Sequence, residues 1–441
     1  MNHKMNRRHF LRTSAVAGGA ALALGRLPFA GRLQASGVPY ATSPNPARSQ
    51  VSLITGTDHV DNVFRALQPF KKQIAAAIGN RPVLIKPNCV SHGATALADT
   101  PVECLEGILE FLKSIGRTDA TVAENCPGGL LIPAFSLDNY FTLLKKYRVR
   151  FKDLSQEGAQ PFKVWNSGTS GASSYRSATD PTDGVFVAKM LLKPRKYFVI
   201  SACRPKTHNY QVATLSYKNM GMGSALENQT IYVPGQSGWP DVKQHMHWVA
   251  TNAGSTGSYN AVYCSGCQDL CDTLYMLAQV LAPDMSVIDA YQGMEGQGPG
   301  SGTAVNQQAA IAGLDWLAVD RVAVEIMNIA AGVAANGGDP AAYTDSTKQY
   351  QWNWPMYPAA LNYCGQYKKQ IGTDAGGNPV YSYLGQYDLN MIDVLGPAPS
   401  TLQAALANQH AAGGNAGLTY YQLHTSILSE LVYGYTLRDP A

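Results

Sequence analysis

The sequence has few charged residues, and the body of the chain has no evident lysine- or arginine-rich face. Only 15% of the 441 residues are charged, and part of the net charge of +4 lies near the N-terminus. Proteins that bind nucleic acids usually carry a basic face or stripe. The composition therefore argues against nucleic acid as a partner.

Several familiar motifs are also missing. The glycine-rich segment 293–302 is not followed by the Gly-Lys-Ser/Thr of a phosphate-binding loop, and its glycines lack the spacing of a dinucleotide-binding fingerprint. The cysteine run of bacterial ferredoxins does not occur. There is no internal repeat, no coiled-coil heptad pattern, and no apolar run long enough for a stable membrane span. These absences argue against the most common nucleotide sites, solenoids and membrane anchors.

Residues 1–35 have the pattern of an export signal. Two adjacent arginines precede Phe10 and Leu11 in MNHKMNRRHFLRTS, and a short, weakly apolar run follows at 15–24. This resembles the twin-arginine translocation signal; the alternatives are a general secretory signal or a flexible basic tail. The resemblance implies a periplasmic or extracellular protein that is exported already folded and meets the twin-arginine translocase on the way.

The rest of the chain has a globular composition, with 45% hydrophobic residues and its 25 prolines and 42 glycines spread out. Strand-like runs alternate with amphipathic helical ones. Strands are expected at 81–87, 119–125, 183–192, 196–202, 285–290 and 388–396, and helices at 100–116, 135–148, 269–283 and 314–329. Thr100 is the expected N-cap of the helix at 100–116. This order predicts an α/β fold, with a mostly parallel sheet flanked by helices and with long irregular insertions.

The same alternation suggests how the chain is organised. The expected parts are a signal peptide (1–35), a linker and first helix (36–79), an α/β core (80–330), an aromatic-rich insertion (331–387), and a C-terminal strand and helix that complete the domain (388–441). Irregular segments as long as the insertion are often lids or binding elements.

Two segments just beyond predicted strands are rich in cationic and amide side chains. IKPNCVSHG (85–93) contains Lys86 and Asn88. CRPKTHNYQVATLSYKNMG (203–221) contains a second set: Lys206, His208, Lys218 and Asn219. Ligands of open α/β sheets bind at the carboxyl ends of the strands, lysine suits phosphate or carboxylate, and histidine suits acid–base chemistry or metal binding. The two segments predict an anion site; the alternative is a solvated basic loop.

A third segment, VIDAYQGMEGQGPGSG (287–302), combines carboxylates with glycines. Asp289 and Glu295 are candidates for general bases or metal ligands, and the backbone around Gly296 and Gly298 can approach an anion closely. The alternative is a flexible turn with two ordinary carboxylates.

The chain has eight cysteines, and three of them form a C-x₂-C-x₃-C pattern: Cys264, Cys267 and Cys271. Such a triplet can ligate a metal or an iron–sulfur cluster. In an exported protein, a disulfide from Cys264 to one of the other two, or buried thiols, is the favoured interpretation. Three further cysteines lie near strand ends beside the predicted site, where a thiol or metal role stays open: Cys89, Cys126 and Cys203.

Five motifs occur in order between about residues 80 and 330: IKPN, PKTH, SYKNMG, IDAYQGMEGQGP and LDWLAVDRVA. Together they resemble the domain of unknown function 362 family. The resemblance implies an α/β domain that in some members accompanies iron–sulfur modules, with no reaction established for the family as a whole. Its motif positions fall on Lys86, Pro87, Asn88, Lys206, His208, Lys218, Asn219, Asp289, Glu295, Gly296, Gly298 and Pro299. This chain lacks the cysteine run of the appended ferredoxin modules.

These observations predict an exported protein that acts on a small anionic molecule, most simply a metal-assisted or redox enzyme. The expected catalytic residues are His208, Lys206, Lys218, Asp289 and Glu295. The expected ligand-binding residues are Lys86, Asn88, Asn219, Gly296 and Gly298. The cofactor is left unknown: a metal ion is possible, with the cysteine triplet as a minor candidate site, and an iron–sulfur cluster is less expected. The alternatives are a non-catalytic periplasmic anion-binding protein and an iron–sulfur electron carrier.

Overall fold

The structure is a computed structural model of the 441-residue chain. It describes residues 45–90, 97–126, 131–166, 174–176, 184–208, 212–226, 270, 273–295, 303–327, 364–365, 367–388 and 391–396. Several predictions lie outside these residues: the export signal, Gly296, Gly298, Cys264, Cys267, Cys271, most of the aromatic-rich insertion and the C-terminal helix.

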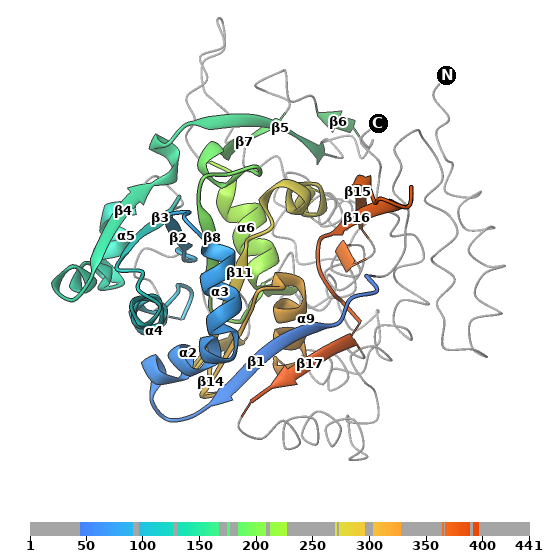
Figure 1. The fold of residues 1–441 in the computed structure, drawn as a ribbon. Coiled ribbons are helices and arrows are strands. Elements are labelled where there is room, and N and C mark those ends of the chain that lie inside the picture. Colours follow the sequence, from blue (N-terminus) through green and yellow to red (C-terminus); the bar gives the residue numbers. More distant parts are fainter. Residues whose placement is uncertain are drawn as a thin grey trace, which may run out of the picture.

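An eight-stranded sheet forms the centre of the described structure (Figure 1). Its strands lie in the order β17-β1-β14-β11-β8-β2-β3-β4. Their bounds are β1 (Ser49–Thr55), β2 (Val83–Lys86), β3 (Asp119–Glu124), β4 (Arg148–Asp153), β8 (Phe198–Cys203), β11 (Met285–Ala290), β14 (Ala309–Gly313) and β17 (Ile392–Leu395). Neighbouring strands of this sheet run parallel except at β14, which is antiparallel to both β1 and β11. The predicted α/β fold with a mostly parallel sheet is confirmed.

Helices cover both faces of the sheet and create two hydrophobic cores (Figure 1). One core lies under α2 (His59–Leu67), α3 (Lys71–Ile78), α4 (Val102–Ser114) and α5 (Leu131–Leu137). The other lies under α6 (Ser216–Ser224), the helical segment 273–281 and α9 (Trp316–Ile326). Successive strand residues point to opposite faces, so Leu84 enters one core whereas Val83 and Ile85 enter the other. This double covering explains why β2, β8 and β11 are buried along their whole length and are nearly continuous apolar runs in the sequence.

Smaller elements surround the central sheet. A four-stranded sheet, β10-β9-β12-β13, contains β9 (Lys206–His208), β10 (Val212–Thr214), β12 (Gly293–Glu295) and β13 (Thr303–Val305). A second small sheet, β6-β5-β7, contains β5 (Ala159–Asn166), β6 (Ser174–Arg176) and β7 (Gly184–Ala188), and a hairpin joins β15 (Lys368–Thr373) to β16 (Pro379–Tyr383). The 3₁₀ helices are η3 (Gln68–Phe70), η5 (Tyr140–Lys145), η6 (Leu154–Gln156) and η7 (Lys189–Leu191).

The helix predicted at 135–148 is wrong in its bounds. The structure divides this region into α5, which ends at Leu137, and η5, which begins at Tyr140. Asn139 lies between them with a left-handed backbone (φ 61°), which interrupts a regular helix. The residues from Arg148 onward then form β4 at the edge of the sheet.

The predicted N-cap of α4 is also wrong. The cap position is Pro101, and no side chain caps the helix there. The Thr100 hydroxyl instead accepts a hydrogen bond from the Asn88 backbone N–H (2.9 Å) and donates one to the Ala202 carbonyl (2.9 Å). Thr100 therefore ties the end of β8 to the segment that follows β2, which is where the candidate site lies.

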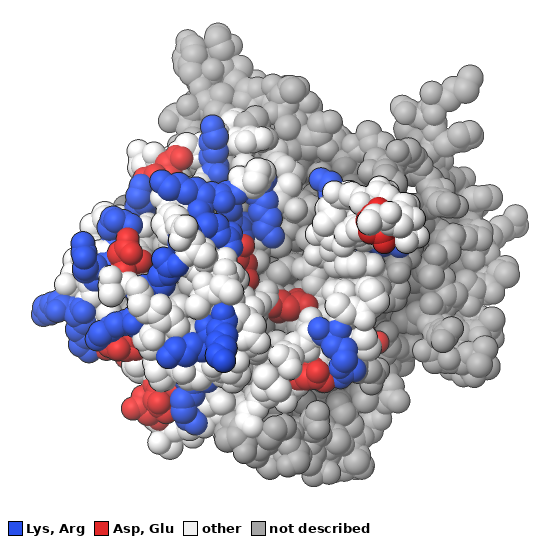
Figure 2. All heavy atoms as spheres, in the orientation of Figure 1, with Lys and Arg blue, Asp and Glu red and all other residues white. Residues whose placement is uncertain are grey.

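Basic side chains on the face drawn in Figure 2 lie among acidic ones. Arg150 on β4 is 3.5 Å from Asp119 on β3, and Lys152 is 2.7 Å from Glu157. Exposed pairs of this kind contribute little to stability and are typical of a solvated surface. Among the described residues, no helix is long and apolar enough to span a membrane.

Candidate functional site

The strand order of the sheet reverses at β2 and β8, which lie side by side. From β2 the chain adds β3 and β4 on one side, and it then returns to place β8 and β11 on the other side. In open α/β sheets, ligands bind beyond the carboxyl ends of the strands at such a switch point. Lys86 and Glu124 end β2 and β3, Arg204 follows β8, and Asp289 lies near the end of β11. The edge at the switch point thus collects four ionisable side chains, all of them buried.

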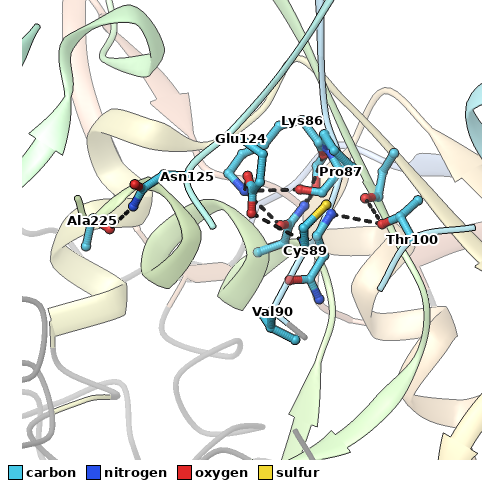
Figure 3. A network of polar contacts seen from close by, with 12 residues as sticks. Lys86, Pro87, Cys89, Val90, Thr100, Glu124, Asn125 and Ala225 are labelled. Carbon is cyan, nitrogen blue, oxygen red and sulfur yellow. Dashed lines mark hydrogen bonds and ion pairs between the residues drawn. The ribbon is translucent and has the colours of Figure 1, made fainter. Parts of the chain in front are cut away.

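Lys86 and Glu124 form an ion pair within the protein (Figure 3). The Lys86 ammonium also donates to the Asn219 side-chain oxygen (3.0 Å) and to the Pro87 carbonyl (3.1 Å). The second carboxylate oxygen of Glu124 accepts a hydrogen bond from the Cys89 backbone N–H (3.4 Å). Lys86 and Asn219 are both predicted site residues, and the structure brings them together. Glu124, which is not among the predicted residues, completes the group.

Helix α6 supplies further contacts to this ion pair. Asn219 donates from its amide nitrogen to the Lys86 carbonyl (3.2 Å) and to the Ser201 hydroxyl (3.0 Å). A Cβ at Gly223 would lie 2.5 Å from the Lys86 ammonium nitrogen, so the lysine reaches the helix at a position that has no side chain. Lys218, also predicted, lies on the same helix and is 8% exposed.

Lys206 and His208 lie on β9 of the small sheet and are both buried. The Lys206 ammonium donates to the Ala98 carbonyl (2.5 Å). Burial lowers the pKa of Lys206 to about 8, although Asp99 nearby acts in the opposite direction. Burial likewise lowers the pKa of Arg204, and here Asp289 opposes the shift. Both cations therefore lie where their charged forms are disfavoured by loss of water.

Asn88 adds a hydrogen-bond donor to this region. Its backbone is fixed by two hydrogen bonds with Thr100, one in each direction (2.8 and 2.9 Å). Its side-chain amide nitrogen is buried and has no acceptor among the described residues. A buried donor left in this state costs free energy, so it favours a ligand that carries an acceptor oxygen.

Asp289 has a partner that the sequence analysis missed. His59, the first residue of α2, places Nε2 2.6 Å from Oδ2 of Asp289. The imidazole stacks on the Tyr291 ring with centroids 4.4 Å apart, and the Tyr291 backbone N–H donates to the other oxygen of Asp289 (3.1 Å). The Asp289 side chain is 1% exposed and that of His59 is 17% exposed, so the histidine is the reachable member of the pair. The local sequence around His59 shows only a helix start, because its partner lies 230 residues further along the chain.

The predicted residues divide between the two faces of the sheet. By strand alternation, Lys86 lies on the face of Leu84, which is covered by α6, and Asp289 lies on the face of Val287, which is covered by α2 and α4. Cys203 belongs to the core on the Lys86 face; burial raises the pKa of its thiol, while Lys86 and Lys206 both act to lower it. Glu295 ends β12, and its side chain is outside the described structure.

A metal site is not identified within the described ranges. No three His, Cys, Asp or Glu side chains converge there as ligands for an ion. The predicted cysteine triplet lies outside these ranges, and the same is true of Gly296 and Gly298. Those assignments remain predictions from the sequence.

The buried ion pair makes a direct prediction about stability. Lys86→Met or Glu124→Gln leaves one buried charge without its counterion, so each single change is expected to lower the free energy of unfolding by about 3–5 kcal/mol. The double variant K86M/E124Q buries no charge there and is expected to lose less than the sum of the two single losses. Urea unfolding followed by circular dichroism measures all three values.

The matched control removes an exposed pair. Arg150→Met, which breaks the contact with Asp119, is expected to cost less than about 1 kcal/mol. If the double variant lost as much stability as the two single variants added together, the coupling between Lys86 and Glu124 would be contradicted.

Comparison with known proteins gives one finding. No curated protein and no solved structure matches the chain. A family model, described as domain of unknown function (DUF362), matches residues 83–325, from the start of β2 into α9. This match covers more than half of the chain and includes every described residue of the site except His59. The chain therefore belongs to the DUF362 family.

Proposed function

We propose that the chain binds a small anion at the carboxyl edge of the central sheet, at the switch point between β2 and β8. The observation that carries this proposal is the combination there of two cations, Arg204 and Lys206, whose charged forms are disfavoured by burial, with the Asn88 amide donor. An anionic oxygen would offset the cost of burying these cations and would accept the hydrogen bond that Asn88 has available. Phosphate esters and carboxylates are the ligand classes with such oxygens.

The His59–Asp289 pair favours an enzyme over a plain binding protein. A carboxylate that accepts from one ring nitrogen fixes the tautomer of a histidine and leaves the other nitrogen, Nδ1, as a proton acceptor. In the pairing of β11 with β8, Ile288 lies opposite Cys203, so the next residues along the two segments, Asp289 and Arg204, are neighbours as well. The His59–Asp289 pair therefore lies next to one of the proposed anion-binding cations. We therefore assign His59 as a general base that removes a proton from the anion bound beside it. The alternative function is a periplasmic anion-binding protein without turnover.

Anion binding can be tested with sulfate, which keeps its charge over the accessible pH range. Lys206→Met removes a charged donor, so the dissociation constant for sulfate, measured by isothermal titration calorimetry, is expected to rise by about tenfold or more. The same change at Lys369, an exposed lysine on β15, serves as the control and should leave the constant unaltered. The affinity is also expected to fall as the pH rises above about 8, because a bound anion favours the protonated form of Lys206. A pH-independent affinity, or equal effects of the two variants, would refute the assignment of Lys206.

The general base can be tested separately from binding. Small carboxylates and phosphate esters that bind the chain are incubated in D₂O, and ¹H NMR follows exchange of their carbon-bound protons. His59→Gln keeps a polar side chain but has no basic nitrogen, so exchange is expected to stop while sulfate affinity is retained. Exchange that persists in this variant would exclude His59 as the base. Binding without exchange or turnover in the wild-type chain would support the binding-protein alternative.

We also propose that the chain is exported by the twin-arginine route, on the strength of the arginine pair that precedes Phe10 and Leu11. Replacing Arg7 and Arg8 together by lysine keeps the charge and is expected to retain the full-length precursor inside the cell. Cell fractionation with immunoblotting measures the exported share. Unchanged export of the lysine variant would instead indicate a general secretory signal.

A further inference from the structure

Cys89 and Cys126 follow neighbouring parallel strands at matching positions. In the registered pairing of β2 with β3, Ile85 lies opposite Val122. Cys89 comes four residues after Ile85, and Cys126 comes four residues after Val122. Both side chains belong to the hydrophobic core under α4 and α5, so they lie on the same side of the sheet.

The two thiols are buried and interact with each other. Cys89 is 0% exposed and Cys126 is 1% exposed, and neither is in a disulfide. The Cys89 sulfur lies 3.7 Å from the Tyr140 hydroxyl. Burial raises the pKa of the Cys89 thiol well above its usual value, and the neighbouring Cys126 raises it further. The paired strands β2 and β3 end at Lys86 and Glu124, so the chain reaches the two cysteines within three residues of neighbouring strand ends and in the same core. A disulfide requires Cα atoms roughly 4.4–6.8 Å apart.

We propose that Cys89 and Cys126 are a redox site that forms a reversible disulfide beside the Lys86–Glu124 ion pair. The backbone N–H of Cys89 donates to Glu124, and Glu124 in turn holds Lys86 (Figure 3). A bond from Cys89 to Cys126 would fix the end of β2 to the end of β3 at this point. The linkage itself stands independently of the anion site; only its effect on ligand affinity rests on the proposed function.

The chemistry is a thiol–disulfide exchange with a small disulfide as the oxidant. One cysteine, as its thiolate, attacks a sulfur of the oxidant, which breaks the oxidant's S–S bond and gives a mixed disulfide. The second cysteine then attacks this mixed disulfide, so that the two protein sulfurs are joined and the oxidant leaves as two thiols. The pair loses two electrons and two protons. Asp138 is a half-buried carboxyl near Cys89; burial raises its pKa to about 7, and it can accept the proton from that thiol.

The test uses the full-length chain and mass spectrometry. The protein is reduced, freed of reductant, oxidised with trans-4,5-dihydroxy-1,2-dithiane, quenched in acid, unfolded in the presence of N-ethylmaleimide, and digested. The expected result is a cross-linked peptide that joins Cys89 to Cys126, with Cys104 of the same core alkylated as the internal control. Alkylation of both Cys89 and Cys126, or a link from either to another cysteine, would overturn the proposal.

Variants extend the test to function. Cys126→Ala is expected to abolish the cross-link, whereas Cys104→Ala, an equally buried cysteine, keeps it. The oxidised wild-type chain is expected to unfold at a higher temperature than the reduced chain, because the disulfide restricts the unfolded state; equal midpoints would contradict a closed linkage. Sulfate affinity is expected to differ between the two redox states of the wild-type chain but not in Cys126→Ala. If sulfate binds neither state, the anion proposal fails while the cross-link result still decides the redox site.

Discussion

A lysine and a glutamate buried together at the ends of two neighbouring strands determine the arrangement of this protein's site. Removing either charge from water is costly, and the mutual attraction offsets that cost only if further hydrogen bonds satisfy both groups. Those bonds come from three places: Asn219 on α6, the Pro87 carbonyl, and the Cys89 backbone N–H. The pair therefore requires β2, β3 and α6 to be placed together. This placement determines how side chains are arranged at the carboxyl edge of the sheet.

The cations on the other side of the edge are of a different kind. Lys86 has a carboxylate at hydrogen-bond distance, whereas burial holds the pKa values of Arg204 and Lys206 below their usual ones despite the carboxylates nearby. Perturbed buried groups of this sort are concentrated at functional sites, where a ligand completes the electrostatic balance. The structure thus shows that Lys86 has a carboxylate partner and that burial lowers the pKa of Arg204 and Lys206, a difference that residue types alone do not reveal.

Much of the sheet could be predicted from the sequence because its central strands are buried on both faces. β2, β8 and β11 are nearly continuous apolar runs, and the charged residues at or just after their ends mark the carboxyl edge. The edge strand β4 (RVRFKD) alternates polar and apolar residues; it was not among the predicted elements, and the helix predicted at 135–148 ends on its first residue. Strand β1 was not among the predicted elements either.

The partners at the site were harder to predict, because they depend on contacts between distant parts of the chain. Glu124 ends a strand like many other acidic residues, and only the pairing of β2 with β3 gives it a role. His59 begins a helix far from Asp289 in the sequence. Thr100 has the sequence context of a helix cap, but its hydroxyl is used between β8 and the segment after β2. In each case local pattern identified the element, and tertiary packing decided the role of the side chain.

The small sheet β10-β9-β12-β13 connects two segments at the carboxyl edge of the central sheet, so that a shift in one affects the other. β9 follows β8 and β12 follows β11, and the two pair with each other at Lys206 and Met294. The Met294 backbone N–H also donates to the Pro205 carbonyl (3.0 Å), and a Cβ at Gly293 would lie 3.0 Å from the same oxygen. These contacts couple the segments that follow β8 and β11, so a displacement of Lys206 is expected to move the segment that carries Glu295. A substitution that shifts one of these segments is therefore expected to shift the other, although eighty-odd residues of chain lie between them.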